Sequence, residues 1–202
     1  MSIGTSKQRL AIFASGRGSN ARTIVEHFQD HAEVEVALIL SNREDALVLE
    51  MATKHGIPTH VTNRAEFRSE ESVVPLLQEH QIDWIALAGF LWLIPSALIK
   101  AYPKHIVNIH PALLPKYGGK GMYGMNVHRA VKEASENESG ITIHLIDEEY
   151  DKGEMAFQAR VQLDESDSPE DIAAKVLKLE HRFFPMVMEA LMTGSEMPDP
   201  KS

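Results

Sequence analysis

The sequence of 202 residues contains no cysteine, which excludes disulfide bonds, thiolate metal sites and a cysteine nucleophile. It also lacks any run of the ~20 apolar residues that a membrane-spanning helix needs, so we expect no membrane partner. Residues 1–7 do not carry the long apolar stretch of a signal peptide, and we therefore expect a cytoplasmic protein. The net charge of −9, without a cluster of Lys and Arg, argues against a nucleic-acid partner.

The composition is that of an ordinary soluble globule, with 44% apolar and 24% charged residues. No polar, low-complexity stretch interrupts the middle of the chain. We therefore predict a single domain over residues 1–202, with flexible ends at 1–7 and 196–202. Its assembly as a monomer or a homodimer remains open at this point.

Apolar, β-rich segments recur with helical patterns between them, at residues 8–14, 34–40, 57–61, 83–88 and 105–109. This alternation predicts an α/β fold with a mostly parallel, Rossmann-like sheet and helices on both faces. The first helix should carry an apolar stripe along one face, and further helices should follow it in the chain. The stripe is Ala21, Ile24, Val25 and Phe28, and the further helices are expected at 43–55, at 66–80 and from Pro95.

The last third of the chain has a different character. Strands at 140–146 and 154–163 are joined by a turn too short for a helical crossover, so we predict an antiparallel hairpin at one edge of the sheet. A final helix should begin after Ser168, an N-cap followed by Pro169 and two acids. Its expected core face is Ile172, Val176, Leu179, Phe183 and Met186, with a kink at Pro185.

A glycine-rich turn, SGRGSNA at residues 15–21, lies between the first predicted strand and helix. Free N–H groups at a helix N-terminus favour a phosphate, which makes this turn a candidate phosphate site. A tight turn also needs glycine for purely structural reasons. Gly16, Gly18 and Ala21 fit the dinucleotide pattern G-x-G-x-x-A, and Arg43 could meet a ribose 2′-phosphate, so an NADP-binding oxidoreductase is an alternative.

Asn108 and His110 leave the carboxyl end of the fifth predicted strand, where ligands bind in open parallel sheets. Alternation along a strand puts both side chains on the same side. An amide and a protonated imidazole can together stabilise an oxyanion. His110 could also merely end the strand, but Asn108 and the two prolines that follow favour the functional interpretation.

Asp151 lies in the acidic turn of the predicted hairpin, where an aspartate is often only solvated. If the hairpin packs beside the fifth strand, one carboxylate of this turn would hold the His110 imidazole charged. The spacing alone does not say which of its four acids does so. The remaining histidines show no convincing metal-ligand spacing, and we predict no metal.

Several phrases of the sequence make it similar to the phosphoribosylglycinamide formyltransferases, folate-dependent enzymes of purine synthesis. They are SGRGSN near the start, LAGFLWLIP at 87–95, NIHPALLPKYGG at 108–119, HRAV at 128–131 and the turn at 151–153 followed by FQARV. The resemblance covers nearly the whole chain in order. It implies formyl transfer from 10-formyltetrahydrofolate, as co-substrate, to the amine of 5′-phosphoribosylglycinamide.

The resemblance also implies roles for particular residues. Asn108, His110 and Asp151 match the catalytic residues of the family, and Glu180 matches a residue that contacts the glycinamide. The substrate-phosphate loop corresponds to Gly18, Ser19 and Asn20. The folate pocket corresponds to Leu91, Trp92, Leu93 and Ile94, to Asn108 and, by a looser alignment, to Arg68. Trp92 departs from the family, in which arginine is common.

Other enzymes of the superfamily remain possible. An enzyme that formylates another amine, such as an amino sugar, would share the catalytic residues. The tRNA-formylating branch would require a further carboxyl-terminal domain and a basic surface, and the deformylase branch a further domain ahead of the first strand.

Overall fold

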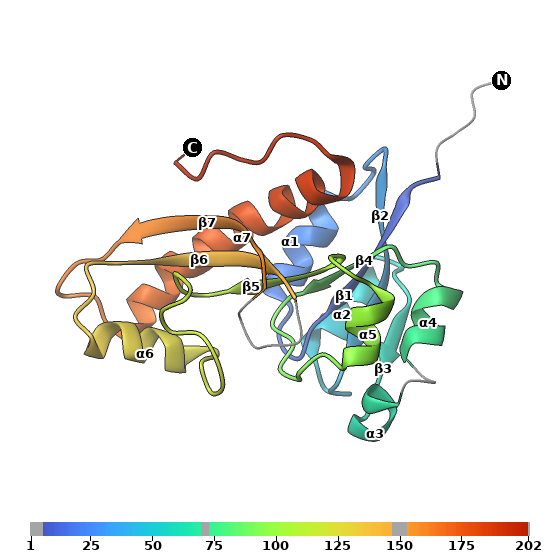
Figure 1. Cartoon of the computed structure of the whole chain (residues 1–202), viewed down its shortest axis with the longest axis horizontal. Helices are drawn as coiled ribbons and strands as arrows, with labels where there is room; N and C mark the ends of the chain where they lie inside the picture. The colour runs from blue at the N-terminus through green and yellow to red at the C-terminus, as the bar shows by residue number, and fades with distance from the viewer. Residues whose placement is uncertain (1–5, 70–72, 147–152, 202) are drawn as a thin grey trace.

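A computed structural model describes residues 6–69, 73–146 and 153–201, and Figure 1 shows the chain from blue to red along its length. The strands are β1 (Gln8–Phe13), β2 (Val34–Ser41), β3 (Thr59–Val61), β4 (Trp84–Leu87), β5 (Ile106–His110), β6 (Glu138–Leu145) and β7 (Met155–Gln162). The helices are α1 (Ser19–His27), α2 (Leu47–Lys54), α3 (Arg64–Arg68), α4 (Val73–Glu79), α5 (Ser96–Ala101), α6 (Met125–Glu133) and α7 (Pro169–Thr193).

The strands form one sheet in the order β3-β2-β1-β4-β5-β6-β7. The pairs from β3 to β5 are parallel, whereas β6 is antiparallel to both β5 and β7. The predicted α/β class, the parallel sheet and the antiparallel hairpin at one edge are therefore confirmed. β5 is the last parallel strand, and its carboxyl end meets the hairpin.

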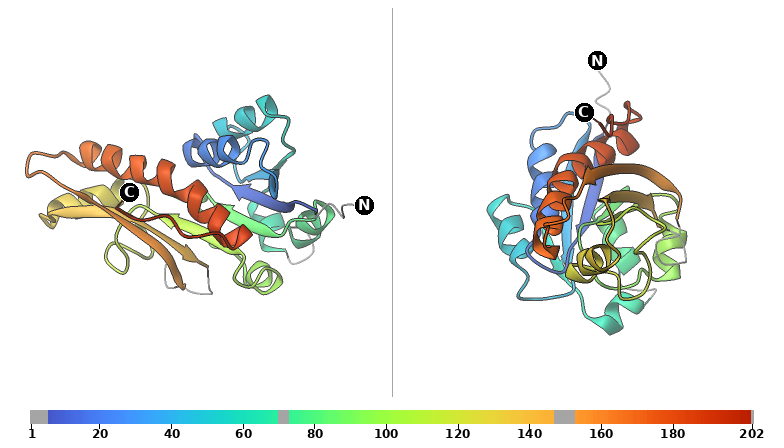
Figure 2. Two further views of the ribbon diagram at one scale, coloured as in Figure 1. Left: turned by 90° about the horizontal axis from the view of Figure 1, so that it is seen from above. Right: turned by 90° about the vertical axis from the view of Figure 1, so that its left-hand side faces the viewer.

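Each face of the sheet has its own core. Alternate strand residues pack with α1, α2, α6 and α7 on one face and with α3, α4 and α5 on the other. Figure 2 shows these layers from above, with α7 and α1 on one side of the sheet and α5 on the other. The face of the hairpin opposite α7 is covered by the segment after β5. Gly140 permits this close packing, because a Cβ there would lie 2.7 Å from Leu113 Cδ2 and 2.0 Å from the Ala159 carbonyl oxygen.

Two predicted helices differ from the structure. The helix expected at 43–55 begins only at Leu47, because Ala46 is extended. The helix expected at 66–80 is instead two helices. Asn63 starts α3 with a capping box, and the extended backbone of Ser69 ends it. Pro75 would clash with the preceding turn of one continuous helix, but it is tolerated in the first turn of α4.

The long helix α7 begins as predicted. Ser168 accepts a hydrogen bond from the Asp171 N–H, Asp171 bonds back to the Ser168 N–H, and Pro169 occupies the first turn. The core face is correct at Ile172, Val176 and Phe183 but wrong at Met186, which is 38% exposed. The buried stripe passes through Phe184 and Val187 instead, because this part of α7 packs on α1 as well as on the sheet. The helix continues through Pro185.

Candidate active site

Asn108 and His110 both lie in β5, two residues apart. Ile109, between them, joins the core under α7, so the two polar side chains leave the opposite face of the strand. Asn108 is half-buried, and His110 is buried, with 4% of the residue exposed. The predicted juxtaposition of this amide and this imidazole at the carboxyl end of the strand is therefore present.

His144 is a third polar group at this site, which sequence reasoning missed. It lies opposite Asn108 in the antiparallel β5–β6 ladder, and Asn108 Nδ2 is 3.1 Å from His144 Nε2. With the amide nitrogen as donor, His144 Nε2 accepts, so the contact orients the Asn108 amide. Pairing the predicted hairpin with the fifth strand in register would have revealed His144.

Two groups approach the His110 ring from other segments. Its Nε2 lies 2.8 Å from the backbone carbonyl oxygen of Tyr117, in the segment that covers the hairpin. His128 reaches toward it from α6, a helix that was not predicted. Burial, and then repulsion by His110, lowers the pKa of His128, which favours a neutral His128 beside the catalytic candidate.

Asp151, the predicted carboxylate of the site, lies outside the described residues. Backbone hydrogen bonds hold the described residues on each side of that segment. The Ile146 N–H donates to the Ile106 carbonyl oxygen at 2.8 Å, and the Leu145 N–H donates to the Glu154 carbonyl oxygen at 2.9 Å. The described residues that precede this segment are therefore held beside the amino end of β5, and those that follow it are held beside β6.

The glycine-rich turn leads directly into α1. Gly18 is the N-cap in the left-handed conformation, with φ 72°, and no side chain caps the helix. Ser19 is exposed at the first position of α1. The exposed N-terminus of a nine-residue helix leaves backbone N–H groups available for an anion.

Glu180 of α7 meets this turn, which brings two sequence-predicted substrate residues together. Asn20 Nδ2 donates to Glu180 Oε2 at 2.7 Å. Burial raises the pKa of Glu180, and the Asn20 hydrogen bond opposes that shift. A buried carboxylate beside an anion-binding turn suits a ligand that carries an amine or hydroxyl groups near its phosphate.

The segment expected to line a folate pocket runs between β4 and α5. Leu91 and Leu93 are 57% and 50% exposed, whereas Ile94 is buried in the core. Ser15 Oγ, at the end of β1, accepts a hydrogen bond from the Leu91 N–H at 3.0 Å. This contact ties residues 91–94 to the glycine-rich turn, which begins at the same serine.

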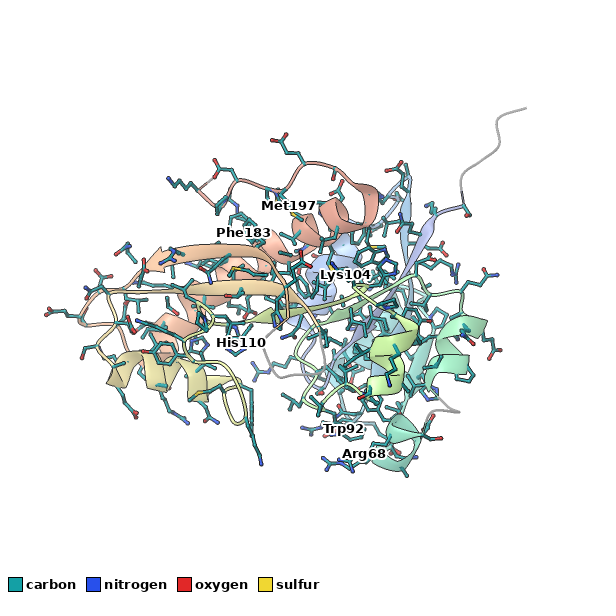
Figure 3. The ribbon with its side chains drawn as sticks, viewed as in Figure 1. Arg68, Trp92, Lys104, His110, Phe183 and Met197 are labelled. Atoms are coloured by element: carbon teal, nitrogen blue, oxygen red, sulfur yellow. The ribbon has the colours of Figure 1, made fainter. Side chains whose placement is uncertain are left out.

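Trp92 is the departure from the family, and its ring packs into an aromatic cluster. Its centroid lies 5.6 Å from that of Phe67 and 6.1 Å from that of Phe90, and the Arg64 guanidinium sits 5.4 Å above it. Arg68 is exposed at the end of α3. Figure 3 shows Arg68 and Trp92 near α3, apart from His110.

The structure also bears on the dinucleotide alternative. Arg43, the residue that could have met a 2′-phosphate, forms a bidentate pair with Asp45 at 3.0 and 2.7 Å. A phosphate there would have to replace an existing carboxylate. Among the described residues, no group of three or more His, Cys, Asp or Glu could hold a metal ion, and no helix is long and apolar enough to cross a bilayer.

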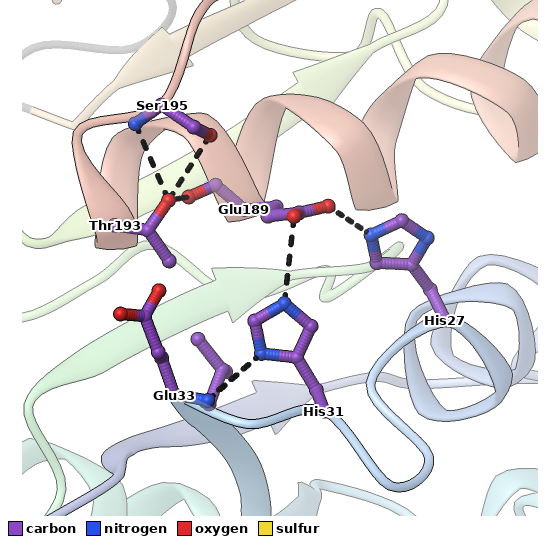
Figure 4. Close-up of polar contacts among 7 residues, drawn as sticks. His27, His31, Glu33, Glu189, Thr193 and Ser195 are labelled. Atoms are coloured by element: carbon purple, nitrogen blue, oxygen red, sulfur yellow. Dashed lines mark hydrogen bonds and ion pairs between the residues drawn. The ribbon is translucent and has the colours of Figure 1, made fainter.

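Two other histidines, His27 and His31, have structural contacts with α7. His27 Nε2 and His31 Nε2 lie 2.6 and 3.4 Å from the two oxygens of Glu189, joining α1 and the turn after it to α7 (Figure 4). His31 Nδ1 accepts from the N–H groups of Glu33 and Val34. The neutral ring therefore carries its proton on Nε2, directed at the carboxylate.

Comparison with known proteins gives a consistent family. A family model described as formyl transferase matches residues 8–188. A phosphoribosylglycinamide formyltransferase of Bacillus subtilis is 35% identical, over 92% of this chain and 95% of its own length. A crystal structure of phosphoribosylglycinamide formyltransferase from Streptococcus pneumoniae superposes with a TM-score of 0.81 at 36% identity, over 91% of this chain and 98% of that one.

The chloroplastic phosphoribosylglycinamide formyltransferase of Arabidopsis thaliana is 41% identical over 92% of this chain. The chain spans 65% of the length of that relative and 61% of the one from Vigna unguiculata, which is less than two thirds of each. The family model nevertheless covers residues 8–188, and the Bacillus subtilis relative is matched over 95% of its own length. The chain therefore belongs to the formyl transferase family.

Proposed function

We propose that this chain transfers a formyl group from 10-formyltetrahydrofolate to the amine of 5′-phosphoribosylglycinamide, a step of purine biosynthesis. The observation that carries the proposal is the pair Asn108 and His110 at the carboxyl end of β5, in a chain of the formyl transferase family. Relatives named for this activity match over almost the whole chain. Both substrates are small molecules, and we propose neither a metal nor a nucleic-acid partner.

The phosphate of the glycinamide substrate is proposed to bind at Gly18, Ser19 and Asn20. The left-handed Gly18 and the uncapped start of α1 direct backbone N–H groups to this point. Glu180, held by Asn20, then faces the ribose or glycinamide end of the same substrate. The carboxylate would accept hydrogen bonds there, which fixes the substrate relative to β5.

The folate is proposed to lie against residues 91–94 and Asn108. Exposed apolar side chains at Leu91 and Leu93 provide contact area, and the backbone of the segment provides polar groups. Because Ser15 joins Leu91 to the start of the phosphate-binding turn, the two substrates would meet at a fixed separation. Much of the rate enhancement would come from this orientation. Arg68 and Trp92 would lie at the outer part of this pocket.

In the transfer step, the amine nitrogen forms a bond to the formyl carbon, the bond from that carbon to the folate nitrogen breaks, and a proton moves from the amine to the folate nitrogen. Negative charge develops on the formyl oxygen meanwhile. Asn108 and protonated His110 would stabilise it, each worth about 3 kcal/mol as an oxyanion donor. Asp151 would keep the imidazole charged and assist the proton transfer through water.

The test is to incubate the purified chain with 10-formyltetrahydrofolate and phosphoribosylglycinamide and to follow folate release by absorbance. The proposal expects release only when the amine is present, with one formylated amine per folate. Release with an amino sugar but not with the glycinamide would replace the substrate. No release with any amine, together with binding of NADPH, would favour the oxidoreductase instead.

A further inference from the structure

The contact between His110 and Tyr117 sets which nitrogen of the catalytic candidate carries a proton. A carbonyl oxygen only accepts hydrogen bonds, so His110 Nε2, at 2.8 Å from the Tyr117 oxygen, must be the donor. The neutral ring is then the Nε2–H tautomer. Nδ1 is then the nitrogen that gains a proton when the neutral ring becomes charged.

The backbone of Tyr117 has an unfavourable conformation that requires support. Its φ of 58° lies in the left-handed region, which an aromatic residue rarely adopts. Such a conformation costs about 1–3 kcal/mol and persists only where neighbouring contacts hold it. The carbonyl that accepts the hydrogen bond from His110 Nε2 belongs to this strained residue, so the direction of that carbonyl depends on what fixes Tyr117.

Glu136, just after α6, provides that support from a distant part of the chain. Its Oε1 accepts hydrogen bonds from the Tyr117 hydroxyl at 2.8 Å and from Lys116 Nζ at 2.7 Å. The bonds from Lys116 and Tyr117 hold the pKa of Glu136 below its usual range, while burial and then Glu136 raise the pKa of Tyr117 to about 12. At neutral pH the contact is therefore a phenol donating to a charged carboxylate, one of the stronger kinds of hydrogen bond.

The same region offers a matched control. Lys116, Tyr117 and Glu136 line a pocket of about 240 Å³, and Glu138 and Arg160 line it as well. Glu138 forms an ion pair with Arg160, with no contact to Tyr117 among its described bonds. A change at Glu138 therefore removes a like charge two residues from Glu136 and leaves the support of Tyr117 in place.

We propose that Tyr117, fixed by Glu136, is a positioning residue that holds the His110 ring in the orientation required for formyl transfer, with a proton on Nε2. The proposal rests on the proposed function for its catalytic consequence, but the geometry can be measured without substrate. The titratable groups that face this ring are His128 from α6 and, through Asn108, His144 from β6. Asp151 is the remaining candidate, outside the described residues.

The direct test is NMR of the ¹⁵N-labelled chain, in which the Nε2–H proton of His110 is assigned by its loss in His110→Gln. A buried N–H bonded to a carbonyl should exchange slowly with water. We expect Tyr117→Phe and Glu136→Ala to speed that exchange at least about tenfold, because the carbonyl is no longer held. Glu136→Gln, which keeps an acceptor oxygen, should stay nearer to the wild type, and Glu138→Gln should be within about twofold of it.

Kinetics provide the second measurement. Tyr117→Phe should lower kcat about tenfold, with KM for both substrates within about twofold of the wild type. The pH profile of kcat should also shift in this variant. Glu138→Gln should change neither kcat nor its pH profile. The positioning role would be overturned if His110 of the wild type carried no proton on Nε2. It would also be overturned if the exchange rate of that proton were unchanged in both Tyr117→Phe and Glu136→Ala. If the Nε2 proton of the wild type exchanges slowly as expected but the protein transfers no formyl group, the proposed function would be overturned. The contact by which Tyr117 orients His110 would still stand.

Discussion

Replacing Gly18 with alanine should destabilise the protein through two separate effects. The φ of 72° is costly for any residue with a Cβ, by about 1–2 kcal/mol. The new Cβ would also lie 2.5 Å from Val48 Cγ2 and 3.1 Å from the Val48 Cα, so α2 would have to shift. Overpacking of this kind costs about 1–3 kcal/mol. We therefore expect Gly18→Ala to lower the free energy of unfolding by roughly 3 kcal/mol.

Gly16→Ala is the matched control, because the same turn has nothing within 4 Å of a Cβ built at Gly16. Thermal unfolding of both variants should show a Tm lower by about 6–12 °C for Gly18→Ala, at 2–4 °C per kcal/mol for a chain of this size, and nearly unchanged for Gly16→Ala. Equal stability of the two variants would refute the assignment of Gly18 as the residue that lets α1 and α2 approach.

Two further predictions concern carboxylates of α7. Because burial raises the pKa of Glu180, the folded chain binds the proton of this carboxyl more tightly than the unfolded chain does. Ionisation of Glu180 therefore lowers the stability of the fold as the pH rises above 4.5, the usual pKa of a glutamate. Glu180→Gln should therefore be more stable than the wild type at pH 7.5 but not at pH 4, while kcat/KM for the glycinamide falls. Urea unfolding at both pH values and steady-state kinetics check this. A variant less stable than the wild type at pH 7.5 would contradict it. Burial would also raise the pKa of Glu189, but its hydrogen bonds with His27 and His31 outweigh that effect and hold the pKa below 4.5. The contribution of Glu189 to stability is present above pH 4.5 and is lost as the pH falls through the lowered pKa. Glu189→Gln should therefore cost about 0.5–1 kcal/mol of stability at pH 6 and almost nothing near pH 3. Unfolding curves of the wild type and the variant that remain apart near pH 3 would refute the argument.

The arrangement of the sheet could be predicted because its strands are continuous apolar runs separated by helical patterns, as at 34–40 and 83–88. The antiparallel edge followed from one short turn, and the start of α7 from the capping chemistry of Ser168. Each of these signals is local. The residues concerned specify their own conformation, and the strand order then follows from the connections between them.

The helix α6 was missed although its buried residues, Val127, His128 and Val131, have helical spacing. Its stability comes from packing on α7, which the sequence pattern does not show. The exposure of Met186 is of the same kind, since packing on a neighbouring element decides it, whereas Pro75 was a local signal for the break after Arg68.

At the site, the sequence predicted the pair on β5 but not the groups that orient it. His144 contacts Asn108 through the register of the β5–β6 ladder, and Tyr117 contacts His110 through a left-handed backbone. Neither contact has a sequence signature of its own. The proximity of Asn20 and Glu180, in contrast, agrees with the roles that the family resemblance implied for both.

The account depends most directly on one carboxylate of the turn between β6 and β7. Turnover should be measured for Asp151→Asn beside Asp147→Asn, Glu148→Gln and Glu149→Gln, with folate affinity determined for each by fluorescence titration. We predict that kcat falls at least about 100-fold in Asp151→Asn alone, with unchanged folate affinity, because the proposed mechanism assigns to this acid alone the role of keeping His110 charged. Wild-type turnover in Asp151→Asn, or an equal loss in one of the other three variants, would contradict the proposed catalytic group.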